Sequence, residues 1–200
     1  MSNLQKFKEH NVTLDDVINY LRSDEREECT VRFPFDGSLS GNPNEIVTKI
    51  LFINYNESTQ IKNTDIRNKL LTHINKLSDK EWKIIQSGEL DERYFKIIDK
   101  IAMGHKIVGK RKGKETSEHN LTSFASKFCG SHNQKAPFWD NLVSDLLNYL
   151  GYKYQYRNYR AYVEQFSVLQ KKLRDDNIGE YSLRDIESAM WHIADKAVNY

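Results

Sequence analysis

The chain has 200 residues, of which 38% are hydrophobic, and a formal net charge of +2. This length and composition predict a soluble globular protein with one sizeable core or two smaller ones. No apolar run approaches the roughly 18 residues that a membrane-spanning helix needs. The first 16 residues are charged throughout and lack the apolar centre of a signal peptide, so we expect a cytoplasmic protein with no membrane association.

Helical periodicity runs through the first half of the chain. Apolar residues recur at steps of three and four from Leu14 to Leu21, which predicts a helix that starts at Thr13. Residues 23–44 interrupt this pattern and hold two of the three prolines, so they predict a long loop with a short extended piece around 30–33. Further helices are expected at residues 44–53, at 63–77, after the capping-box sequence Ser78-Asp79-Lys80-Glu81, and at 91–101.

Two stretches of the second half are strongly basic. Residues 104–114 form a glycine-punctuated loop, and residues 152–160 alternate tyrosines with basic residues. Basic groups neutralise phosphates and aromatic rings stack on bases, so together these stretches predict nucleic-acid contact. A solvated loop and a tyrosine-rich packing surface are the alternatives. The basic residues of the loop considered for DNA contact are Lys110, Arg111, Lys112 and Lys114.

The remaining pattern is also helical. Helices are expected at about 117–130, at about 140–150, at 156–174 and from Ser182 onward. Neither an internal repeat nor convincing strand alternation is present, so the sequence predicts an all-α protein. We expect one globular unit made of two helical lobes, residues 1–103 and 115–200, which flank a cleft and are joined by the basic loop 104–114.

The stretch with the most specific chemistry is residues 123–143, where Pro137-Phe138-Trp139-Asp140 precedes an apolar helix. Asp140 has two interpretations. As an N-cap, its carboxylate accepts the free N–H groups of the helix that follows. As a functional group, the same carboxylate faces a cleft, where it stabilises a developing cation or orients a water molecule.

Residues 115–152 resemble the helix-hairpin-helix DNA glycosylase superfamily, and in particular the 8-oxoguanine glycosylases. The sequence Ala125-Ser126-Lys127-Phe128 resembles the helix after the hairpin, and Ala136-Pro137-Phe138-Trp139-Asp140 resembles the loop that leads to the essential aspartate. The resemblance implies DNA as the partner, duplex or single-stranded, and no cofactor. It also implies that Asp140 stabilises oxocarbenium character at the sugar as the base departs.

The sequence departs from this family in two places. Members that cut the strand use a lysine nucleophile, and Ser123 stands at that position, so hydrolytic removal of a base is expected rather than strand cleavage. Lys127 lies one turn further along the same helical face and is a candidate helper, with a solvated surface lysine as the alternative. The hairpin stretch 118–123 lacks glycine, and the DNA contacts that it implies are His119, Asn120 and Ser123. Asn120 can adopt the left-handed conformation that glycine usually supplies.

Several aromatic and sulfur-containing residues carry two interpretations. Phe138 and Trp139 are candidate walls of a pocket for a flipped base, with core packing as the alternative. Trp191 is expected in the core. Cys129 and His132 lie three residues apart, but they have no visible partners, and the distant Cys29 does not supply one. We therefore expect neither a metal site nor a disulfide framework.

These patterns lead to three hypotheses. The first is a base-excision glycosylase that removes a damaged or modified base, with Asp140 essential. The second is a catalytically silent helical module that binds nucleic acid through residues 110–114 and 152–160, or binds another protein. The third is a helical adaptor without a nucleic-acid role.

Overall fold

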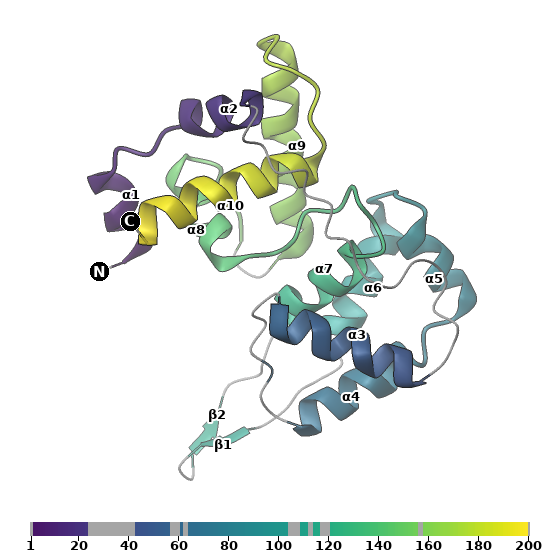
Figure 1. Ribbon diagram of the computed structural model, residues 1–200. Helices are drawn as coiled ribbons and strands as arrows, with labels where there is room; N and C mark the ends of the chain where they lie inside the picture. Colours follow the sequence, from purple (N-terminus) through teal and green to yellow (C-terminus); the bar gives the residue numbers. More distant parts are fainter. Residues whose placement is uncertain are drawn as a thin grey trace. The chain divides into compact units, whose positions relative to one another are not determined.

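The computed structural model describes residues 2–23, 43–56, 61, 64–103, 109–111, 114–116, 121–155 and 158–199. In these ranges it contains ten helices and one two-stranded hairpin (Figure 1), which confirms the predicted all-α class. The chain forms two compact units. The first unit combines Met1–Val31 with Gln134–Tyr200, and the second unit is Arg32–Asn133. This division differs from the lobes expected from the sequence, because the N-terminal helices pack with the C-terminal ones.

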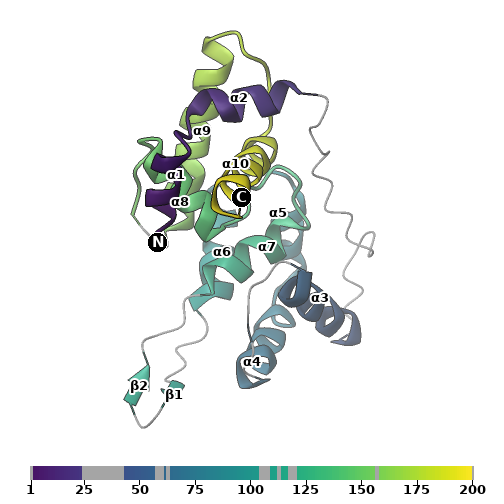
Figure 2. The ribbon, with the colours of Figure 1, turned by 60° about the vertical axis from the view of Figure 1, so that its left-hand side comes forward.

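The first unit is built around its last helix. Its members are α1 (Asn3–Glu9), α2 (Leu14–Arg22), α8 (Asn141–Tyr149), α9 (Tyr159–Asp175) and α10 (Leu183–Asn199). Helix α10 contacts each of the other four, and it is the yellow helix that lies among them in Figures 1 and 2. Met190 and Ala194 of α10 are fully buried, as expected for a central helix. Helix α1 was not predicted, because Phe7 is its one buried residue.

The second unit packs its helices around α6 and α7. Its members are α3 (Pro43–Asn56), α4 (Thr64–Ile74), α5 (Asp79–Gln86), α6 (Glu92–Met103) and α7 (Thr122–Gly130). Helix α6 contacts α4, α5 and α7, and α3 contacts both α4 and α7. Every residue of α7 except Ser123 is buried, so this helix forms the core of its unit.

A short antiparallel hairpin follows α6 and precedes α7 in the chain. Strand β1 (Gly109–Arg111) pairs with β2 (Lys114–Thr116), and Arg111 lies opposite Lys114. The prediction of an open loop is therefore wrong for these residues. Antiparallel pairing satisfies backbone N–H and C=O groups that an open loop leaves to water.

The predicted helix starts depend on capping groups that the structure contains. Ser78 and Glu81 form the expected capping box, in which the Ser78 backbone N–H donates to Glu81 Oε2 at 2.8 Å. Thr13 and Asp16 form the same arrangement before α2. The predicted loop 23–44 and its extended piece at 30–33 lie almost entirely outside the described residues. None of the helices in the described ranges combines the length and apolar composition needed to cross a bilayer.

Trp191 corrects a prediction about the core. Its side chain is 44% exposed, whereas Met190 beside it is fully buried. Successive helical residues are about 100° apart around the axis, so the face that buries Met190 turns Trp191 toward solvent.

Candidate functional site

The loop before α8 is the best-defined candidate site of the first unit, because several buried polar side chains hydrogen-bond to its backbone. Residues 136–140, which we call the clamped loop, are buried except for the half-buried Asp140. Two tyrosines of α9 hold its backbone. Tyr159 donates its hydroxyl to the Pro137 carbonyl at 2.6 Å, and Tyr162 donates to the Phe138 carbonyl at 2.8 Å. The loop is thus fixed by side chains that follow it in the sequence by about twenty residues.

Helix α10 holds the same loop through a buried ion pair. Glu187 Oε2 accepts the Phe138 N–H at 3.4 Å and lies 3.5 Å from Nη1 of Arg184. The Arg184 guanidinium carbon lies 3.0 Å from the centroid of the Phe138 ring. Both charged side chains are only 7% exposed. Such a pair, removed from water, is retained only if its charges and hydrogen bonds are well matched, and here it fixes both the backbone and the ring of Phe138.

Tyr162 lies at the centre of an aromatic cluster beneath the loop. Its ring centroid is 5.0 Å from that of Trp139 and 5.5 Å from that of Tyr154, whose hydroxyl is 2.5 Å from Ser144 Oγ. Burial, followed by the nearby negative charge of Glu187, raises the pKa of Tyr162 well above its usual value. The phenol therefore stays protonated at neutral pH and remains a hydrogen-bond donor to the loop.

Asp140 ends the clamped loop and begins α8. Its backbone is extended, with φ −129° and ψ 139°, and its Oδ1 accepts the Leu142 N–H at 2.8 Å. The N-cap interpretation is therefore confirmed. The same helix start presents further N–H groups and the positive end of the helix dipole, a setting that favours negative charge. The catalytic role of Asp140 stays a prediction.

Phe138 and Trp139, the predicted pocket walls, are both buried in the first unit. Arg184 covers one face of the Phe138 ring, and the tyrosines of the cluster surround Trp139. Both residues thus pack in the core, as one of the two interpretations expects. Their contribution to a base pocket is a prediction.

Lys127 lies on α7 of the second unit and is 6% exposed. The alternative of a solvated surface lysine is therefore wrong, because the whole of α7 except Ser123 is buried. Ser123 is half-buried one turn earlier on the same helix, and its carbonyl accepts the Ser126 hydroxyl at 3.0 Å. The structure thus places Lys127 in the second unit and Asp140 in the first.

The basic residues proposed for DNA contact fall into three groups. Lys110 and Arg111 lie on β1, and Lys114 lies on β2. In the 152–160 stretch, Lys153 is exposed and Arg160 pairs with Glu164 at 3.1 Å, while Tyr159 is buried and supports the loop. For Tyr159 the packing interpretation of this stretch is confirmed. Ser123 lies on α7, whereas Lys112, His119, Asn120 and residues 156–157 of the second stretch lie outside the described residues.

Cys129 and His132 belong to an aromatic core in the second unit. Cys129 is fully buried and not in a disulfide, and burial raises the pKa of its thiol, which makes it a poor nucleophile. The His132 ring meets the edges of Trp82 and Phe128 at 5.6 and 5.5 Å between centroids. Within the part of the chain that the structure describes, no group of His, Cys, Asp and Glu side chains is arranged to hold a metal ion.

The ion pair Arg184–Glu187 was not predicted as part of the site. A signal for it exists, because Glu187 shares a helical face with Leu183, Met190 and Ala194. A carboxylate on an otherwise apolar face indicates a buried charge that needs a partner.

Comparison with known protein families gives a match over most of the chain. The family HI_0787_N, described as an N-terminal domain, matches residues 2–136. The matched segment covers the whole second unit and stops just before Pro137 and Asp140. No curated protein and no solved structure matches the chain.

Proposed function

We propose that this chain, which belongs to the HI_0787_N family, is a DNA-binding, glycosylase-like protein that removes a damaged or modified base, with Asp140 as the essential carboxylate. One observation carries this proposal: Asp140 ends a loop whose backbone is held by Tyr159, Tyr162 and Glu187. A carboxylate held in place before the reaction stabilises developing positive charge without having to reorganise. Catalytic groups need such support from the residues around them.

The chemistry that this carboxylate would serve is hydrolysis of an N-glycosidic bond. The bond between the base and the sugar breaks, and its electron pair leaves with the base. Positive charge then grows at the anomeric carbon, and the Asp140 carboxylate stabilises it. A water oxygen bonds to that carbon, and the proton that the water loses neutralises the departed base, directly or through solvent, which completes the hydrolysis. Strand cleavage through a lysine adduct is not part of the proposal, since Ser123 stands where the resemblance places that lysine.

The glycosylase resemblance also makes Lys127 a candidate helper of this reaction, and this stays a prediction because Lys127 belongs to the second unit and Asp140 to the first. A lysine that is 6% exposed is unusual, because burial of an ammonium group is costly unless it is compensated. Its place on α7, one turn after Ser123, matches the segment that carries the glycosylase resemblance.

DNA binding is proposed to use the basic hairpin. Lys110, Arg111 and Lys114 concentrate positive charge on two paired strands, with Glu115 as the one acid among the paired positions. Each lost phosphate contact makes the negative slope of log affinity against log salt less steep by about 0.9 for duplex DNA. Lys110→Glu with Arg111→Glu should therefore weaken binding and flatten its salt dependence. Lys83→Glu, an exposed lysine of α5, is the control for a change in net charge.

The experiment that tests the proposed function is a lesion panel. Duplex and single-stranded oligonucleotides, each with a different modified base, are incubated with the protein and then treated with hot alkali to reveal abasic sites. Base release from at least one substrate supports the glycosylase proposal. Tight, salt-sensitive binding without release overturns the catalytic part and leaves a silent binding module. If the protein neither binds any of these oligonucleotides nor releases a base from them, the whole proposal is overturned.

A further inference from the structure

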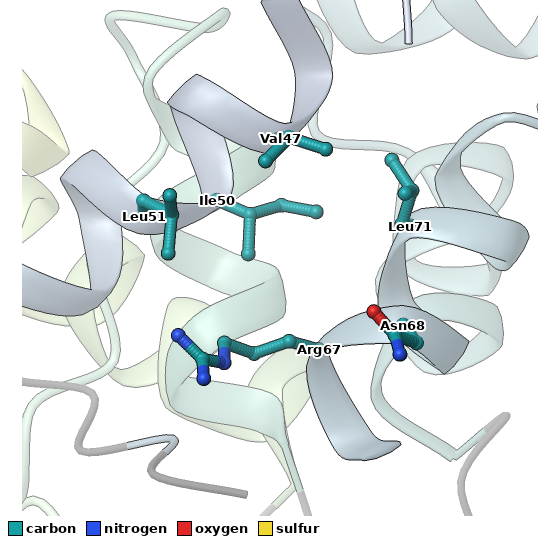
Figure 3. Close-up of a pocket in the computed structure, with 6 residues that line it drawn as sticks. All are labelled: Val47, Ile50, Leu51, Arg67, Asn68 and Leu71. Atoms are coloured by element: carbon teal, nitrogen blue, oxygen red, sulfur yellow. The ribbon is translucent and has the colours of Figure 1, made fainter. Parts of the chain in front are cut away.

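A pocket lies between α3 and α4 of the second unit, and none of its lining residues has a role assigned above (Figure 3). Its volume is about 260 Å³. Three lining residues come from α3 at helical spacing, and three come from α4, so each helix presents one face to the pocket. The lining residues are Val47, Ile50, Leu51, Arg67, Asn68 and Leu71.

The lining is apolar except at one end. Figure 3 shows Arg67 and Asn68 at one end, with Val47 and Leu71 at the other. The Arg67 side chain extends from α4 toward α3, and its Nε atom is buried. A pocket with this division suits a ligand that has one polar end and one apolar end.

Charge decides what the polar end of the ligand must be. Arg67 is the one charged residue among the six that line the pocket, and Asn68 contributes an amide from the same helix. A guanidinium offers five N–H donors in a planar fork, so it can hold an anion while it keeps other contacts. The planar fork matches the two oxygens of a carboxylate.

We propose that this pocket binds a small carboxylate with an apolar body, such as a short-chain or branched aliphatic acid. The carboxylate lies against the guanidinium of Arg67, and the apolar body packs against Val47, Ile50 and Leu71. The volume is slightly below the range of about 300–1,000 Å³ typical of drug-sized ligands, which favours a ligand of few atoms. Leu51 is 44% exposed at this site, so a bound apolar body would also cover it.

This proposal does not depend on the glycosylase proposal, and it is tested on the full chain with hexanoate. Isothermal titration or chemical-shift changes should show saturable binding, with a Kd on the order of a millimolar or tighter for a ligand of this size. Hexanamide has nearly the same shape without the charge and should bind about tenfold more weakly.

Two variants test the residues that carry the proposal. Arg67→Gln should weaken hexanoate binding by about tenfold or more and remove the preference over hexanamide. Lys69→Gln removes the same charge from an exposed position on the same helix that does not line the pocket, and should leave binding unchanged. Leu51→Glu alters a partly exposed side chain, so it should preserve the fold while the added charge repels the carboxylate.

The proposal is overturned if hexanoate does not bind, if hexanamide binds equally well, or if Arg67→Gln and Lys69→Gln have the same effect. Unchanged binding by Leu51→Glu would also overturn it, because that variant places an acid at the site itself.

Discussion

Tyr162 connects the stability of the first unit to the position of Asp140 through one hydroxyl. Its donation to the Phe138 carbonyl at 2.8 Å is buried, so removal of the hydroxyl leaves a carbonyl that water does not reach. Tyr162→Phe should lower the free energy of unfolding by about 1–3 kcal/mol, measured by urea denaturation. The control is Tyr152→Phe, which changes a half-buried tyrosine that does not hold the clamped loop. Equal effects of the two changes would contradict the role assigned to the Tyr162 hydroxyl.

Arg184 and Glu187 form the second support of the loop, and a double-mutant cycle tests it. Glu187→Leu alone leaves a guanidinium buried without its acid and should cost about 3–5 kcal/mol of stability. Arg184→Met combined with Glu187→Leu should cost clearly less than the sum of the single changes, because neither charge remains. Additive costs in urea unfolding would show that the two side chains act independently.

At the residue scale, the sequence predicts the features that depend only on a residue and its neighbours in the chain. The cap at Asp140 and the burial of Cys129 follow from residue type and from the pattern around them. The burial of Lys127 and the exposure of Trp191 were not predicted. Both depend on which neighbouring helices pack around α7 and α10, and a single helical pattern does not contain that information.

At the scale of elements, the start of α5 illustrates how one acid can tie a helix to its neighbour. Glu81 accepts hydrogen bonds from Ser78 at the cap and from Lys100 of α6 at 2.6 Å. Burial alone would raise the pKa of Glu81, but the hydrogen bonds from Lys100 and Ser78 outweigh it, and the net direction is downward from 4.5. The charged form is therefore favoured in the folded protein.

This shift predicts a pH dependence of stability. Because the folded pKa of Glu81 is lowered, its contribution is present above about pH 4.5 and is lost as the pH falls through the folded value. Between pH 6 and pH 3, the wild type should therefore lose more stability than Glu81→Gln, which lacks the titrating group. Glu164→Gln, in an exposed pair with Arg160, should follow the wild type. Identical profiles for wild type and Glu81→Gln would contradict the role of this carboxylate.

Most helices were predicted because their apolar spacing and caps are local. The strands β1 and β2 were missed because three residues each are too few to show alternation. The short α1 was missed because a single buried residue, Phe7, makes no periodic pattern.

At the scale of the whole molecule, the chain order does not give the division into units. The first unit joins the two ends of the chain, whereas the sequence suggested a boundary at the basic stretch 104–114. The cause is the apolar face of α2, which packs on α10 from the other end of the chain. The sequence of each helix shows its apolar face but does not show which distant helix covers that face.

The segment with the glycosylase resemblance supplies α7 to the second unit and α8 to the first. The family match extends through α7 but ends before Asp140. The family match therefore gives no information about Asp140, and its role has to be tested by mutation of this chain. Asparagine is the informative replacement. Asparagine caps a helix about as well as aspartate but lacks the charge. The replacement thus separates the cap from the chemistry.

The decisive measurement is the single-turnover rate of base release by the wild type and by Asp140→Asn, on whichever lesion the wild type processes, with unfolding curves recorded for both proteins. We predict a loss of about 100-fold or more in rate, with stability changed by no more than a few tenths of a kcal/mol. A variant that is equally stable and releases the base at the wild-type rate would show that Asp140 is a helix cap alone, and would contradict its proposed catalytic role.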